Sequence, residues 1–121
     1  MIDLLFDTAD SIVSQADHEG VNLQDKVLLS IAIRVKAEKF ITEELRTVKG
    51  VDYWSTQFSY GRLLGKEFET QFPDSQHLAT LKKVSVTVCS NIHLNSFMYE
   101  PILDLSITHL IDLYNEISGL T

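Results

Sequence analysis

Cys89 and three of the histidines, His77, His93 and His109, are the side chains best suited to metal binding or nucleophilic chemistry. Three residues separate Cys89 from His93, a spacing that two ligands of one zinc ion can adopt, but no CxxC or HxxxH pair completes a tetrahedral site. A cysteine nucleophile with a histidine base would also need an orienting group and an oxyanion hole, and no motif supplies them. We therefore expect no metal and no cofactor, and keep a small enzyme centred on Cys89 and the histidines as the second alternative function.

Gly61 and Gly65 lie one helical turn apart and are followed by Lys66, which superficially suggests a phosphate-binding loop. That motif needs four residues between its glycines, a Ser or Thr after the lysine and a preceding strand, and the sequence meets none of these conditions. Glycines at this spacing instead favour the close approach of another helix. We expect that contact within the chain, and leave open a contact between subunits.

Two charged stripes are candidates for binding. Asp3, Asp7 and Asp10 lie on successive turns of one helical face, where they could hold a divalent ion or meet a basic partner, but a solvated acidic face near a helix N-terminus is the preferred interpretation. Lys36, Lys39 and Arg46 are the candidate nucleic-acid contacts in the basic middle of the chain, where a solvated, salt-bridged helix face is the preferred interpretation. Glu43 shares their stripe and the net charge is −7, so we disfavour nucleic acid as the main partner.

The segment 91–103 fits neither a helical nor a strand period, and Pro101 favours an extended backbone before it. The segment contains consecutive large side chains, among them Met98 and Tyr99, with polar groups interspersed in the rest of it. We prefer an irregular connection whose aromatics fill the core; the alternative is an exposed surface for a partner. With the two glycines, the candidate interaction residues are then His93, Asn95, Met98, Tyr99 and Glu100.

Helical periodicity dominates the remainder of the chain. We expect an amphipathic helix of about 16 residues at the N-terminus, a central helix over about 22–48, a helix from Asp52 to Phe72, a fourth from Ser75 and a last one capped by Asp104 or Ser106. Residues 27–33 hold a single polar residue, Ser30, which predicts a stretch without a solvent face. Ile31→Asp is therefore predicted to be among the most destructive changes. The alternating β-branched residues 84–88 resemble a strand, but without a partner strand a helix that frays or ends between Val84 and Cys89 is preferred.

The sequence as a whole predicts an all-α protein, a single compact bundle of about five helices over residues 1–121. Its 45% apolar content is that of a folded domain, no stretch could span a membrane, and a lone cysteine without a signal-like N-terminus indicates a cytoplasmic location. The favoured function is a non-catalytic helical interaction or accessory module of a bacterial or phage multi-component system, binding a protein partner or a second copy. The first alternative is a nucleic-acid-associated regulator that uses the basic half of the second helix.

Overall fold

The structure is a computed structural model that describes residues 2–15, 23–57, 59–89 and 106–120. Those residues form five continuous helices and no strand, which confirms the all-α bundle. The helices are α1 (Ile2–Val13), α2 (Leu23–Lys49), a run of α3 (Tyr60–Arg62), η1 (Leu63–Phe68) and α4 (Glu69–Gln71), a run of α5 (Leu78–Val84) and η2 (Ser85–Cys89), and α7 (Ile107–Ser118). The segments η1 and η2 are π-helical. No helix in the described ranges is both long and apolar enough to cross a membrane.

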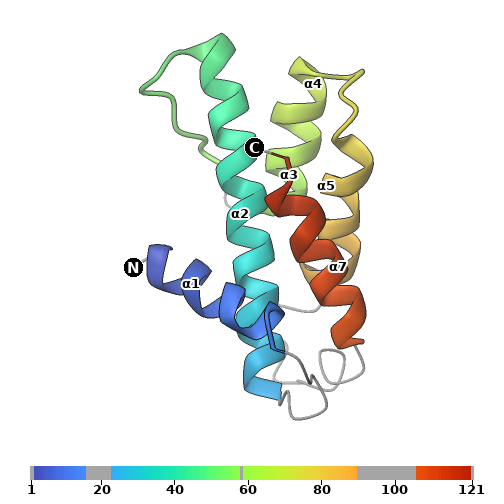
Figure 1. Ribbon diagram of the computed structural model, residues 1–121. Coiled ribbons are helices and arrows are strands. Elements are labelled where there is room, and N and C mark those ends of the chain that lie inside the picture. Colours follow the sequence, from blue (N-terminus) through green and yellow to red (C-terminus); the bar gives the residue numbers. More distant parts are fainter. Residues whose placement is uncertain (1, 16–22, 58, 90–105, 121) are drawn as a thin grey trace.

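Helix α2 is the centre of the bundle, as the sequence predicts. It contacts α1, η1, α5, η2 and α7, and Figure 1 shows it running along the molecule with α1 crossing one side and α7 on the other. Its fully buried residues include every fourth position from Leu29 to Leu45, with Ser30 and Ala32 between the first two, and they lie on the faces that meet these neighbours. They are Leu29, Ser30, Ala32, Ile33, Ala37, Ile41 and Leu45. One hydrophobic cluster joins the apolar residues among them to buried residues of every other helix in the described ranges.

The apolar stretch at the start of α2 does have a solvent face, contrary to the prediction. The side chain of Ile31 is 38% exposed, while Ala32 and Ile33 beside it are fully buried. The sequence pattern was misleading because the residue that points outward happens to be apolar, and a helix is recognised as solvent-facing only where polar residues mark that face. Ile31→Asp is therefore no longer expected to be among the most destructive changes.

Helix α2 ends where the sequence predicts, at Gly50. The backbone of Gly50 has a φ of 108°, and its N–H donates a hydrogen bond of 3.0 Å to the carbonyl of Arg46. A glycine adopts this left-handed conformation without the steric penalty that a Cβ would bring. The chain thus leaves the helix in a sharp turn that leads into residues 51–57.

Two predicted helix starts are wrong. The third helix begins at Tyr60 instead of Asp52, and the hydroxyl of Ser59 caps it by accepting from the backbone N–H of Arg62 at 3.2 Å. The fourth begins at Leu78 instead of Ser75, because Ser75 forms a turn in which its hydroxyl accepts from the N–H of His77 at 3.1 Å. Side-chain to backbone hydrogen bonds of this kind compete with helix formation.

The β-branched stretch is helical, as preferred over a strand. Val84 and Val88 are buried one turn apart, while Val86 between them is 75% exposed. The helix continues in π-helical form through to Cys89 and does not end within the stretch before it. The last helix, α7, begins after Ser106 and is closed by Gly119, whose N–H donates to the carbonyl of Asn115 at 3.1 Å. The predicted irregular segment 91–103 lies outside the described residues.

Candidate functional site

Trp54, the only tryptophan of the chain, lies in the loop that follows α2 and is 73% exposed. Its ring stacks on the side chain of Arg46, whose guanidinium carbon lies 4.3 Å from the ring centroid. The same Arg46 donates a hydrogen bond from Nε to the carbonyl of Tyr53 at 3.0 Å. A cation at this distance from an aromatic face is attracted to it. Arg46 therefore holds both the loop backbone and the exposed ring.

The residues on either side of Trp54 are anchored to the next helix. The carboxylate of Glu67 in η1 accepts hydrogen bonds from the hydroxyls of Tyr53 and Ser55, one on each oxygen. The ammonium of Lys49 lies 4.9 Å from the centroid of the Tyr53 ring. These contacts explain why the loop interrupts the predicted helix. They also fix the position of an aromatic side chain that is left in solvent.

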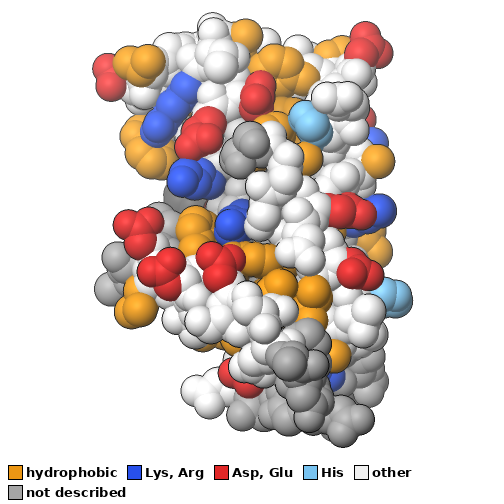
Figure 2. Space-filling view, in the orientation of Figure 1, with side chains coloured by type: hydrophobic (Ala, Val, Ile, Leu, Met, Phe, Trp, Pro, Cys, Tyr) orange, Lys and Arg blue, Asp and Glu red, His pale blue; other side chains and the backbone are white. Residues whose placement is uncertain are grey.

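A groove of about 480 Å³ lies beside Trp54, along one face of α2. Its lining residues on α2 recur at helical spacing from Val35 to Arg46, so the floor extends over about 16 Å at 1.5 Å per residue. The full lining is Asp3, Val35, Glu38, Lys39, Thr42, Glu43, Arg46 and Trp54. Figure 2 shows acidic and basic side chains interspersed along the indented edge where α1 meets α2. The groove is thus a mixed-charge surface bounded by the first turn of α1 and by a tryptophan.

The three candidate nucleic-acid contacts have different environments. The ammonium of Lys36 lies 4.7 Å from the ring centroid of Phe6 and 4.8 Å from that of Tyr114, so this side chain is partly buried between α1 and α7. Lys39 is exposed and lines the groove with Arg46. Asp3, Glu38 and Glu43 line the same groove. The structure therefore brings two of the three basic side chains together, but it places them among carboxylates.

Asp10 does not belong to a purely solvated acidic face. It accepts a hydrogen bond of 2.6 Å from the hydroxyl of Tyr114 in α7. Burial, the hydrogen bond to Asp10 and the negative charge of Asp10 raise the pKa of Tyr114 well above its usual value. Asp3 and Asp7 are exposed, as predicted. Within the described ranges, no group of three or more His, Cys, Asp and Glu side chains is arranged to hold a metal ion.

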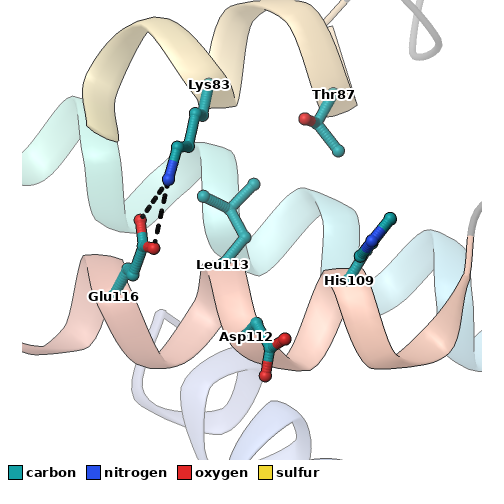
Figure 3. A pocket seen from close by; sticks show the side chains of 6 residues that line it. All are labelled: Lys83, Thr87, His109, Asp112, Leu113 and Glu116. Atoms are coloured by element: carbon teal, nitrogen blue, oxygen red, sulfur yellow. Dashed lines mark hydrogen bonds and ion pairs between the residues drawn. The ribbon is translucent and has the colours of Figure 1, made fainter. Parts of the chain in front are cut away.

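A second, more polar pocket of about 330 Å³ lies between the α5–η2 helix and α7. In Figure 3 Lys83 and Glu116 point toward one another, while His109 lies at the far end of the lining. Their ion pair has an Nζ to Oε1 distance of 3.2 Å, and both side chains are largely exposed. An exposed ion pair of this kind contributes little stability, ~0–1 kcal/mol. Thr87, Asp112 and Leu113 complete the lining.

The glycine prediction is wrong for contacts within the chain. The nearest atom to a Cβ built on Gly61 would be Oγ of Ser59 at 3.7 Å, and a Cβ on Gly65 would meet nothing within 4 Å. Both glycines are exposed, and no other helix of the described chain approaches them. The alternative, a contact between subunits, stays a prediction.

Of the remaining candidates, one is a partly buried packing residue and the others lie in the undescribed part of the chain. The ring of His77 packs edge-on against Phe40, with ring centroids 5.3 Å apart, so this histidine belongs to the packing of α2 against the fourth helix. The interaction candidates His93, Asn95, Met98, Tyr99 and Glu100 lie outside the described residues, as does the side chain of Cys89.

The Trp54 groove was not found from the sequence. The predicted helix from Asp52 to Phe72 places Trp54 in its first turn, where an aromatic residue suggests packing. The available signal was its position four residues after Gly50, which ends the preceding helix.

Comparisons with protein-family models, curated proteins and solved structures found no match to this chain.

Proposed function

We propose that this protein is a non-catalytic protein-interaction module whose binding surface is the groove beside Trp54. The observation that carries the proposal is that Trp54 is 73% exposed and yet held in place by Arg46 and by anchored neighbours. Tryptophan and arginine are enriched among the residues that dominate binding energy at protein interfaces. A side chain already fixed in one position loses less conformational entropy when a partner covers it.

The dimensions of the groove suit a helical partner. Its floor of about 16 Å corresponds to three turns of an α-helix. Amphipathic helices bind such grooves through apolar residues repeated at three- and four-residue spacing. Val35 and Trp54 offer apolar surface for those residues, and the charges of Glu38, Lys39 and Glu43 are placed to set the orientation of the partner.

The two alternative functions receive less support. A nucleic-acid surface would gather Lys and Arg side chains away from acidic ones. The groove instead interleaves Lys39 and Arg46 with three carboxylates, and Lys36 is packed on aromatic rings. An enzyme would need a nucleophile and a base within hydrogen-bond reach, and the described part of the polar pocket offers an exposed ion pair. The cytoplasmic location and the origin in a bacterial or phage system stay predictions from the sequence.

Site-specific cross-linking tests the proposal. A photoreactive amino acid in place of Thr42, at the centre of the groove floor, is expected to capture a protein that mass spectrometry identifies. The matched control carries the same residue in place of Val86, an exposed apolar position on η2. Cross-linking at position 42 that depends on Trp54 and exceeds that at position 86 supports the proposal. Equal capture at both positions, or none at position 42, contradicts it.

A further inference from the structure

We infer that the groove binds the same groove of a second copy of this chain, with the two α2 helices antiparallel about a two-fold axis near Thr42. This inference rests on the proposed function, because it names the partner of the same surface. The groove alone would fit many helices. The order of charges along its floor is what selects a second copy.

The charged residues of the floor follow the order acid, base, acid, base: Glu38, Lys39, Glu43 and Arg46. A two-fold axis that is perpendicular to α2 and passes near residue n brings a residue before n in one copy opposite the residue that lies equally far after n in the other copy. Glu38 and Arg46 are centred on residue 42, and Lys39 and Glu43 on residue 41, so the two centres differ by about 1.5 Å along the helix. One axis therefore places acid opposite base in both pairs, well within the reach of these side chains.

A parallel arrangement of the two α2 helices lacks this match. An axis parallel to α2 would place each charged residue opposite its own copy, so that Glu38 met Glu38 and Arg46 met Arg46. Like charges facing one another across an interface oppose association. The charge order thus selects the antiparallel dimer and rejects the parallel one.

The same rotation gives Trp54 an apolar neighbour. Trp54 stacks on Arg46 and so marks the C-terminal end of the groove floor, while Val35 is the lining residue at the N-terminal end. In the antiparallel dimer, Trp54 of each copy lies over Val35 of the other. Two exposed indole rings would be removed from water in one symmetric contact, which is how a two-fold interface uses one surface twice.

The two residues of the outer pair keep hydrogen-bonding capacity for it. Arg46 uses Nε for the carbonyl of Tyr53, and a guanidinium has five N–H donors. Glu38 accepts from Nε of Arg34 on Oε1 at 2.7 Å, and a carboxylate offers about four acceptor sites on its two oxygens. Each can therefore bind across the interface without losing its contact within the chain.

Charge-reversal complementation tests the inference by sedimentation velocity. The wild-type protein is expected to dimerise with rising concentration, and Trp54, as the only tryptophan, to shift its fluorescence to the blue over the same range. Lys39→Glu places two acids at the inner pair and Glu43→Lys places two bases there, so each variant alone is expected to be monomeric. An equimolar mixture of the two should form a heterodimer, because acid again faces base at both inner positions.

Two further variants complete the test. The double variant Lys39→Glu/Glu43→Lys should recover the homodimer. Lys66→Glu changes the same charge at an exposed position on η1 and should dimerise as the wild type does. Equal thermal stability of the single variants at monomeric concentration shows that they remain folded.

The inference is overturned if the wild-type protein stays monomeric at millimolar concentration, or if the mixture of single variants does not associate. Dimers that form equally in every variant also overturn it. A monomeric protein that still cross-links a different protein at position 42 loses only the second-copy inference. A protein that cross-links nothing at that position loses the proposed function as well.

Discussion

The hydroxyl of Tyr114 in α7 donates a hydrogen bond of 2.6 Å to Oδ1 of Asp10 in α1, joining residues 104 positions apart. The face of the same ring lies 4.8 Å from the ammonium of Lys36 in α2. Tyr114 therefore connects three helices, through a hydrogen bond, a cation–π contact and the burial of its ring. This contact also fixes α1, whose first turn forms one boundary of the groove.

Tyr114→Phe should lower the free energy of unfolding by about 1–2 kcal/mol, because a hydrogen bond to a charged acceptor is lost while the ring and its contact with Lys36 remain. Urea unfolding followed by circular dichroism measures the change. Asp3→Asn, which removes an exposed carboxylate of the same helix, serves as the control and should have little effect. A Tyr114→Phe variant as stable as the wild type would show that the hydrogen bond contributes nothing.

The raised pKa of Tyr114 predicts a loss of stability in alkali. The folded protein holds the phenol proton more tightly than the unfolded chain does, where the pKa is about 10. The corresponding stability is fully present below that pH and is lost progressively as the pH rises above it. Tyr114→Phe should remove this part of the alkaline decline, so the two proteins should approach each other in unfolding free energy at high pH. Parallel curves would contradict the prediction.

The sequence predicted the helices better than their beginnings. The long helix α2 and its end at Gly50 followed from apolar periodicity and one glycine, because both signals are local. The loop before Tyr60 is held by Glu67, further along the same helix, whose carboxylate accepts hydrogen bonds from two hydroxyls of the loop. Such a contact between separate segments cannot be recognised from the local pattern around Asp52.

The candidate site was the least predictable part. Lys39 and Arg46 were selected for their charge, and the structure does place both in the groove. Their combination with Trp54 depends on how the loop turns back over α2, which no spacing in the sequence specifies. Lys36 was expected in solvent because its charge suggested it, but long side chains can bury their stems and bring the ammonium to aromatic rings.

The corrected exposure of Ile31 can be tested against its neighbour Ile33. Ile33→Ala should lower the free energy of unfolding by about 2–5 kcal/mol, because Ile33 is fully buried and the change leaves a cavity. Ile31→Ala should cost distinctly less, since its side chain is 38% exposed. Thermal unfolding of both variants gives the comparison. Equal losses would show that the side chain of Ile31 is buried in solution.

The glycines offer a matched pair of opposite sign. Gly65 lies within a helix and has open space around it, so Gly65→Ala should raise the free energy of unfolding by about 0.5–1 kcal/mol through helix propensity. Gly50 has a φ of 108°, a conformation that disfavours a Cβ, so Gly50→Ala should lower the free energy of unfolding by about 1–2 kcal/mol. Both effects are measured by urea unfolding at a concentration where the protein is monomeric. A destabilising Gly65→Ala would restore the original prediction of a close contact there.

Glu67 should control the mobility of Trp54 without touching it. Glu67→Ala removes the acceptor of the Tyr53 and Ser55 hydroxyls, so the loop between them is expected to lose its fixed position. Trp54 fluorescence anisotropy should fall, and binding at the groove should weaken because the entropy of fixing the ring is then lost on association. The matched control is Glu69→Ala, two residues after Glu67 in the sequence. It removes only an exposed ion pair with Lys82 and should change neither the anisotropy nor the binding. If Glu67→Ala left the anisotropy of Trp54 unchanged, the Arg46 contacts alone would be sufficient to hold the ring.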